Sequence, residues 1–115
     1  MSAVACIFCR IVAGEIPAKI VMQDEELLAL RDINPAAPTH ILVITRRHFA
    51  SVNTLEEGDA TLVGRMILTA KNVAMQEGLS GGYRLVMNTG RDGGQSVDHV
   101  HLHVLGGRAM RWPPG

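Results

Sequence analysis

The segment DHVHLHVLGG, residues 98–107, decides what kind of fold this sequence can form. It places three of the chain's five histidines at every second position, with apolar residues between them. Side chains alternate between the two faces of a β-strand, so a strand over 97–105 would carry His99, His101 and His103 on one face and the apolar residues on the other. The pattern predicts a strand whose apolar face packs on the core and whose histidine face meets a ligand or water.

Three uses of such a histidine face are open: a metal site, a catalytic site or a pH-sensitive polar surface. A strand rises about 3.3 Å per residue, which places His99 and His103 roughly 13 Å apart at the backbone. A zinc ion with nitrogen ligands at about 2 Å could take an adjacent pair, and this spacing disfavours one ion for all three. At least one histidine is therefore left for another role.

A glycine-rich loop, DGGQS at 92–96, comes just before the histidines and follows Asn88, the last residue of another predicted strand. Its two glycines, the second of which is Gly94, can turn backbone N–H groups inward, and Gln95 and Ser96 add polar side chains, a set that suits phosphate. The spacing matches neither a P-loop nor a dinucleotide-binding motif. Because a neutral imidazole is a competent nucleophile toward phosphorus, we predict that His101 attacks phosphorus and that water then hydrolyses the intermediate.

The totals set limits on the class of protein. A chain of 115 residues with 47% hydrophobic and 19% charged residues is typical of one globular domain, which we place at 1–115. Eleven basic and eleven acidic residues balance, which gives no general attraction to nucleic acid or to an anionic membrane and favours self-association. No stretch approaches the roughly 20 apolar residues that span a bilayer. The first ten residues lack a basic region ahead of an apolar one, so we expect a cytoplasmic protein in which Cys6 and Cys9 are thiols or metal ligands.

The remaining periodicities predict a mixed architecture. We expect a short helix from Ile7 to Gly14, a hairpin of 18–24 and 26–32, a strand over 40–49, and further strands over 82–88 and 97–105. A long helix from Thr54 to Gly78 is predicted with a capping box of Thr54 and Glu57 and a glycine stop. Its apolar stripe comprises Leu55, Leu62, Val63, Met66, Ile67, Ala70, Val73 and Ala74. Without a repeating strand–helix–strand rhythm, this order favours an α+β domain, with helices packed on one face of an antiparallel sheet.

The segment His99-Val-His-Leu-His-Val-Leu105 fits the alternating signature of the histidine triad superfamily. The runs IFCRI, EIPAKI, RDINPAAPTH, GYRLVMNTG, DGGQSVDHVHLHVLGGR and RWPPG occur in order, and over nearly the whole chain the sequence resembles the histidine triad nucleotide-binding (Hint) branch. The resemblance implies a sheet of about five antiparallel strands with two helices, paired into a homodimer. It also implies purine nucleoside phosphoramidase activity, which releases AMP from adenosine 5′-phosphoramidates and related aminoacyl adenylates.

The resemblance also implies roles for individual residues. His101 would be the nucleophile, oriented by His40 and by the backbone carbonyl of His99. The phosphate and the leaving group would meet Asn88, Gln95, Ser96 and His103. Asp32 would bind the ribose hydroxyls, and Trp112 would reach the partner subunit's site. The purine pocket would comprise Ile7, Phe8, Ile11, Ile33 and Leu42, although plain core packing explains Ile7, Phe8 and Ile11 equally well from sequence.

The Cys6-x-x-Cys9 pair has metal-ligand spacing, and buried small side chains are the alternative interpretation. Resemblance to bacterial relatives with this pair implies a structural zinc site completed by His48 and His99, with no cofactor required for catalysis. Arg31 and Asn34 depart from better-known relatives near the ribose position, which leaves base and leaving-group preference open. Two other functions stay open, a dinucleoside polyphosphate hydrolase and a non-enzymatic nucleotide-binding scaffold protein.

Overall fold

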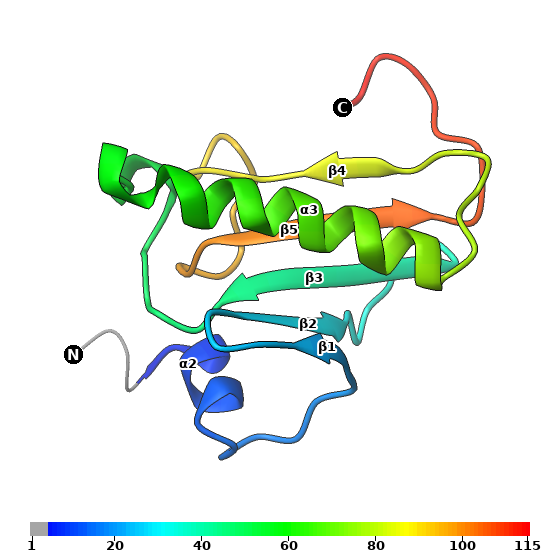
Figure 1. The fold of residues 1–115 in the computed structure, drawn as a ribbon. Coiled ribbons are helices and arrows are strands. Elements are labelled where there is room, and N and C mark those ends of the chain that lie inside the picture. The colour runs from blue at the N-terminus through cyan, green and yellow to red at the C-terminus, as the bar shows by residue number, and fades with distance from the viewer. Residues whose placement is uncertain (1–4) are drawn as a thin grey trace.

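The computed structural model describes residues 5–115, and their central feature is a five-stranded antiparallel sheet (Figure 1). The strands lie in the order β1-β2-β3-β5-β4, so β5 is paired on both sides and β1 and β4 form the edges. The α+β prediction is confirmed. The strands and the two α-helices are α2 (Ile7–Val12), β1 (Ile20–Gln23), β2 (Leu27–Arg31), β3 (Thr39–Thr45), α3 (Ala60–Gln76), β4 (Arg84–Val86) and β5 (His101–Gly106).

The two helices cover opposite faces of the sheet, not one face as predicted. Buried residues of α3 pack with alternate residues of β2, β3 and β5 to form the larger core, which contains Leu27, Ala29, Ile41, Val43, Met66, Ala70, Val73, Ala74, Val100, Leu102 and Val104. The other alternate residues pack under α2 and form a second core of Cys6, Phe8, Leu28, Leu30, Leu42 and Ile44. Strands β2 and β3 are apolar on both faces, and this second apolar face is what the short N-terminal helix covers.

The predicted hairpin of β1 and β2 is confirmed, and its turn has a local cause. The Oδ1 atom of Asp24 accepts hydrogen bonds from the backbone N–H groups of Glu26 and Leu27, both at 2.8 Å. A carboxylate that accepts from the next N–H groups closes the chain on itself, which is why acidic residues are common in such turns.

The long helix begins later than predicted, because two 3₁₀ turns, Val52–Thr54 and Glu57–Asp59, precede it. The Thr54 hydroxyl donates to the carbonyl of Ser51 at 2.8 Å, so it belongs to the first of these turns and not to a capping box with Glu57. Asp59 accepts from the backbone N–H of Glu56 at 2.9 Å and closes the second turn. Local side-chain bonds of this kind compete with the helix and delay its start.

At its other end, α3 stops where the sequence predicts, because Gly78 adopts the left-handed conformation at φ 73°. The predicted apolar stripe is correct for Met66, Ala70, Val73 and Ala74, which are buried. Ile67 is 48% exposed and therefore lies outside the core. None of the helices in the described part of the chain is long and apolar enough to cross a membrane.

Strand β5 is shorter than predicted and begins at His101. The backbone N–H of His99 donates to the carbonyl of Val97 at 2.8 Å, and that of Val100 donates to Phe49 at 2.8 Å, so the chain turns before it enters the sheet. His99 therefore lies off the strand, and the 13 Å spacing along an ideal strand does not apply to it. Strand β4 is likewise shorter than the predicted 82–88. The interpretation of the first ten residues falls partly on residues 1–4, which lie outside the described chain.

Candidate functional site

A pocket of about 260 Å³ lies on the α2 side of the sheet and collects residues from both ends of the chain. Apolar side chains of α2, of the segment that follows it and of β2 and β3 form most of its lining, with two histidines of β5 on one wall. The predicted nucleotide contacts that line it are Ile7, Phe8, Ile11, Asp32, Ile33, Leu42, Ser96, His101 and His103. A concave apolar pocket with a few convergent polar groups is the usual form of a small-molecule site.

His101 is held in one tautomer. Its Nδ1–H donates to the backbone carbonyl of His99 at 2.6 Å, so its Nε2 carries the free lone pair. The ring is only 4% exposed, and the edge of Phe8 contacts it with the ring centroids 5.2 Å apart. The histidine is therefore oriented by a backbone carbonyl and an aromatic wall, and the pocket is the open side of the ring. His101 and His103, from the predicted histidine face, line this pocket, and α2 covers the neighbouring part of the sheet.

His40 contacts His103 and not His101, which differs from the orienting role expected for it. The backbone N–H of Ala36 donates to Nδ1 of His40 at 3.0 Å, so Nε2 of His40 carries the proton when the ring is neutral. That Nε2 lies 2.8 Å from Nδ1 of His103 and 3.4 Å from Oδ2 of Asp32. Nδ1 of His103 accepts the hydrogen bond from this N–H, so the neutral His103 carries its own proton at Nε2, as a donor toward the pocket.

Both rings of this relay favour the neutral form. Burial, helped by the neighbouring His101 and His40 and opposed by the charge of Asp32, lowers the pKa of His103 to about 4. Burial also lowers the pKa of His40, again opposed by Asp32. Asp32, His40 and His103 converge closely enough to be considered as metal ligands. Because His40 Nδ1 accepts from Ala36, a cation at His40 Nε2 would require the imidazolate, and the cluster is better described as a hydrogen-bond relay.

The glycine-rich loop is held by the amide side chains that we expected to bind phosphate. Nδ2 of Asn88 donates to the carbonyl of Gly93 at 2.6 Å. Nε2 of Gln95 donates to the carbonyls of Ala50 at 2.7 Å and Val97 at 3.0 Å, and its Oε1 accepts from the N–H of Gly90 at 2.9 Å. These bonds shape the loop and position Ser96 at the pocket.

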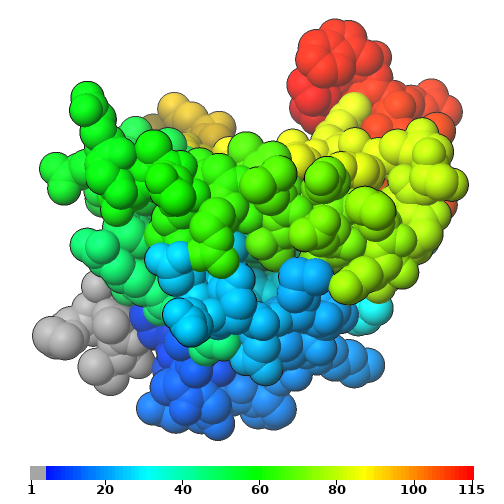
Figure 2. Space-filling model, in the orientation of Figure 1, coloured from blue at the N-terminus to red at the C-terminus, as the bar shows by residue number. Residues whose placement is uncertain are grey.

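Four predicted residues therefore lie outside the pocket lining: Asn88, Gly94, Gln95 and Trp112. Oδ1 of Asn88 is buried and has no hydrogen-bond partner within residues 5–115. Trp112 is 83% exposed, in a C-terminal tail that stands away from the body of the molecule beside β4 (Figure 2). Within this single chain, the tail makes no wall of the pocket.

Cys6, Cys9, His48 and His99 form a second site, which we name the metal cluster. Nδ1 of His99 lies 3.2 Å from Sγ of Cys6 and 3.6 Å from Sγ of Cys9. Nδ1 of His48 lies 3.2 Å from Sγ of Cys9 and 3.2 Å from Nδ1 of His99. A tetrahedral zinc ion with nitrogen and sulfur ligands holds its donors about 3.3 to 3.8 Å apart, so this donor set fits zinc.

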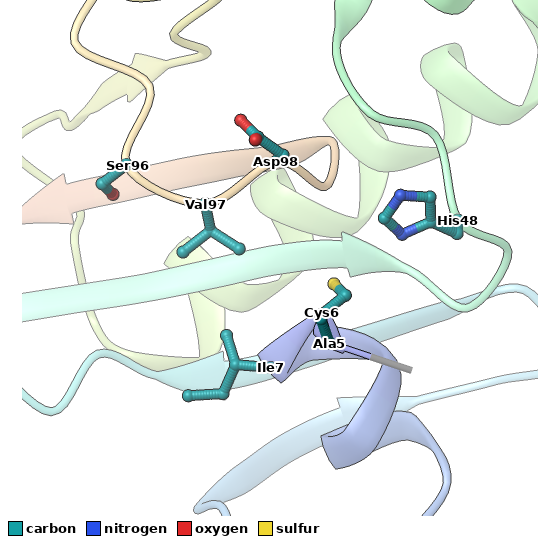
Figure 3. Close-up of a pocket in the computed structure, with 7 residues that line it drawn as sticks. All are labelled: Ala5, Cys6, Ile7, His48, Ser96, Val97 and Asp98. Atoms are coloured by element: carbon teal, nitrogen blue, oxygen red, sulfur yellow. The ribbon is translucent and has the colours of Figure 1, made fainter. Parts of the chain in front are cut away.

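The surroundings of the metal cluster also suit a cation. Nε2 of His99 donates to the backbone carbonyl of Thr45 at 2.6 Å, which directs the Nδ1 lone pair at the cysteines, as is usual for metal-bound histidines. Burial, with a further contribution from Cys6, raises the pKa of Cys9 to about 11, so a bound cation is needed to keep this thiol ionised. A cavity of about 360 Å³, bordered by Cys6, His48 and the segment 96–98, lies beside the cluster (Figure 3).

Sequence reasoning missed three groups at these sites: the Ala36 N–H, the Thr45 carbonyl and the edge of Phe8. Two are backbone groups, which carry no residue-specific signal: the Ala36 N–H acts on the nearby His40, and the Thr45 carbonyl acts on His99, which is distant in sequence. Phe8 was expected as a purine contact, and nothing in its local pattern indicates that it also touches two histidine rings.

The comparisons with known proteins agree with this geometry. The family model of the HIT domain matches residues 13–110. A HIT family hydrolase from Legionella pneumophila superposes with a TM-score of 0.94 at 51% identity, over 96% of this chain and 99% of that one. A 14 kDa zinc-binding protein of Zea mays is 50% identical over 95% of this chain and 87% of its own length. A histidine triad nucleotide-binding protein from Candida albicans has a TM-score of 0.80 at 29% identity, over 94% of this chain and 82% of that one. Since the family model covers most of the sequence and these relatives match nearly all of it, the protein belongs to the HIT-domain family.

Proposed function

We propose that the protein is a purine nucleoside phosphoramidase of the Hint branch, which hydrolyses adenosine 5′-phosphoramidates and aminoacyl adenylates to AMP. The observation that carries the proposal is the tautomer of His101, whose Nδ1–H is bonded to His99 and whose Nε2 is left as a nucleophile beside an apolar pocket. Similarity to the HIT family hydrolase of Legionella pneumophila and to the histidine triad nucleotide-binding protein of Candida albicans supports a nucleotide hydrolase.

The reaction has two steps in this proposal. His101 Nε2 attacks the α-phosphorus; in a phosphoramidate the P–N bond breaks and the amine leaves with a proton supplied through the Ser96 hydroxyl, and in an aminoacyl adenylate the P–O bond breaks and the carboxylate leaves. Water then attacks phosphorus, the P–Nε2 bond breaks, and AMP is released as the proton of that water restores the one taken by the amine. The hydrogen bond from His101 Nδ1 to the His99 carbonyl stabilises the positive charge that the ring gains in the first step.

The other pocket residues bind and orient the nucleotide. Nε2–H of His103 donates to a phosphate oxygen, because the relay through His40 fixes its tautomer. The apolar side chains of α2 and β3 enclose the purine, and Asp32, which already accepts from the N–H of Asn34 at 2.8 Å, has lone pairs left for the ribose hydroxyls. Ser96, at the end of the loop that Asn88 and Gln95 hold in shape, is the loop residue that would meet the phosphate.

We also propose that zinc is the cation of the metal cluster and has a structural role. Two sulfur and two nitrogen ligands that lie close enough to share one ion support this proposal. Similarity to the 14 kDa zinc-binding protein of Zea mays supports it as well. When bound, zinc would supply four ligand bonds that join α2 to the sheet. Elemental analysis of the purified protein tests this assignment, with His48→Ala as the control that should lose the metal.

A homodimer is the proposed assembly, as the family resemblance implies. Apolar side chains of α3, Ile67, Leu68 and Met75, are exposed, and β4 is an open edge of the sheet. An unpaired edge strand beside exposed apolar side chains is a surface that a second copy can cover. Sedimentation at micromolar concentration should give the mass of two chains, and a single-chain mass would contradict this part of the proposal.

The activity is tested with a substrate panel read by AMP release. The panel contains an adenosine 5′-phosphoramidate, an aminoacyl adenylate and a dinucleoside polyphosphate. The wild type should favour the first two, and His101→Asn should lose turnover while it keeps its fold and binds AMP, because asparagine retains a donor for the His99 carbonyl but not the attacking nitrogen. Preference for the dinucleoside polyphosphate would establish the alternative hydrolase, and tight AMP binding without turnover would establish a non-enzymatic nucleotide-binding protein.

A further inference from the structure

His99 takes part in both sites described above, through different atoms. Its imidazole belongs to the metal cluster, with Nδ1 directed at Cys6 and Nε2–H bonded to the carbonyl of Thr45. Its backbone carbonyl accepts the Nδ1–H of His101 at 2.6 Å. The residue is completely buried, at 0% exposure. Any force that fixes the ring of His99 therefore also fixes the atom that sets the tautomer of His101.

Without a cation, the histidine nitrogens of the metal cluster are in an unfavourable arrangement. Nδ1 of His48 and Nδ1 of His99 lie 3.2 Å apart, and Nε2 of His48 is buried with no hydrogen-bond partner in the part of the chain that the structure describes. A neutral imidazole carries one proton, so one nitrogen of His48 is unsatisfied whichever tautomer it adopts. The thiols are weak donors and offer little compensation. When His48 carries its proton at Nε2, the Nδ1 lone pairs of His48 and His99 face each other at 3.2 Å, and a bound cation would accept both lone pairs at once and hold His99 in place.

Phe8 gives the metal cluster a second connection to the nucleophile. Its ring contacts the rings of both His99 and His101 edge-on, with centroids 5.7 Å and 5.2 Å apart. Phe8 lies in α2 between Cys6 and Cys9, and Sγ of Cys6 accepts the N–H of Cys9 at 3.4 Å. A six-residue helix is too short to be stable alone, so the anchoring of its two cysteines decides where Phe8 lies.

We propose that the metal cluster is a positioning device for the nucleophile. A divalent ion held by Cys6, Cys9, His48 and His99 fixes the His99 carbonyl and the edge of Phe8, and through them the tautomer and orientation of the His101 ring. His48 is a positioning residue in this scheme, because it contacts His99 and not the pocket. The inference rests on the proposed function for its kinetic readout only, since the tautomer of His101 can be observed without substrate.

The test compares zinc-loaded protein with protein stripped by a chelator, both labelled with ¹⁵N in the histidine rings. In the loaded protein, His101 should show a protonated Nδ1 that exchanges slowly and an unprotonated Nε2. Stripping should accelerate exchange of this proton and lower kcat for AMP release, each on the order of tenfold, the lower end of the effect usual for groups that support a site. Zinc sulfate added back should restore both.

Two variants separate positioning from general loss of stability. His48→Ala should reproduce the stripped state, and His48→Cys, which restores a four-ligand zinc set, should recover the His101 signal when loaded with zinc. Arg65→Ala is the matched control, because Arg65 lies on the α3 face and pairs with Asp24 and Glu26 away from both sites. Its metal content, His101 signal and kcat should equal those of the wild type.

Several outcomes would overturn the proposal. A stripped protein that stays folded by circular dichroism and keeps an unchanged His101 signal contradicts it, as does a fall in kcat without a change in that signal. If stripping unfolds the chain, a larger divalent ion replaces zinc in the folded protein, and a His101 Nδ1 resonance that does not move then contradicts the proposal. Metal-dependent His101 signals together with no AMP release from any substrate would reject the proposed function and leave the positioning role standing.

Discussion

Lowering the pH from about 7 to about 4.5 should destabilise the protein through His103. Burial, with the neighbouring His101 and His40, holds the pKa of this residue at about 4, against an ordinary value of 6.5. The folded protein therefore keeps the ring neutral where the unfolded chain takes up a proton. The stability that this neutral ring contributes is complete above pH 6.5, falls as the pH drops from 6.5 toward 4, and falls no further below 4.

The size of the effect follows from the two pKa values. Each pH unit between them is worth about 1.4 kcal/mol of unfolding free energy, so a change from pH 7 to pH 4.5 should cost about 2.5 kcal/mol. Burial also lowers the pKa values of His40 and His99, and both add to the loss with the same sign. This is a large fraction of the 5 to 15 kcal/mol that usually stabilises a domain.

Urea unfolding at the two pH values measures this loss, with His103→Asn as the matched variant. Asparagine keeps an acceptor for the Nε2–H of His40 but takes up no proton, so the variant should lose about 2.5 kcal/mol less than the wild type between the two conditions. Both proteins carry the same metal cluster, and its contribution cancels in the difference. Equal losses in the two proteins would mean that folded His103 titrates normally, and the description of the relay as a buried neutral pair would be wrong.

Four further predictions concern other parts of the structure. Gly93→Ala should displace the glycine-rich loop, lower the unfolding free energy by about 1 to 3 kcal/mol and abolish most of the AMP release, because the new Cβ would lie 2.3 Å from the carbonyl oxygen of Thr89. Gly81→Ala is the control, because its new Cβ meets nothing within 4 Å, and it should leave thermal unfolding and turnover unchanged. Phe8→Ala should cost about 3 to 5 kcal/mol and weaken AMP binding in calorimetry, and unchanged affinity would remove Phe8 from the pocket wall. Arg65→Ala breaks exposed ion pairs and should cost less than about 1 kcal/mol in urea unfolding, so a larger loss would show that these pairs are coupled to the core. Chelation should lower the unfolding temperature, and added zinc should restore it, with an increase that follows the logarithm of the free zinc concentration, since a ligand of the folded state stabilises it by mass action. A chelator-insensitive transition would refute the structural role of the metal.

The sequence predicts the parts of the fold that depend on local periodicity. Val100, Leu102 and Val104 alternate with the histidines and pack in the larger core. The period of 3.6 residues correctly places Met66, Ala70 and Val73 on the buried face of α3. The predicted start of α3 is wrong because the Thr54 hydroxyl donates to the Ser51 carbonyl within a 3₁₀ turn. Hydrophobic periodicity does not show which of two local hydrogen-bond patterns a residue adopts.

Relations between distant segments were harder to predict. The apolar residues of α2 show that one side of the helix is buried, but not which face of the sheet covers it. The predicted partner of His40 is wrong because the side chains of β3 and β5 that share one face include several histidines. Only the register of the two strands decides that His40 contacts His103. The four ligands of the metal cluster were assigned by family resemblance, and the structure brings them together although Cys6 and His99 are 93 positions apart.

The position of β5 in the interior of the sheet, between β3 and the edge strand β4, has a consequence for how the protein is made. It pairs with both β3 and β4, yet it is the last of the described strands to leave the ribosome. Until it inserts, Phe8 of the N-terminal helix lacks the rings of His99 and His101, and the two cysteines lack one of their partners. Long-range pairing of this kind folds late because the intervening loop must close first. The pocket beside His101 and the metal cluster should therefore both appear in one step after synthesis, and a nascent chain that ends before His99 should contain neither.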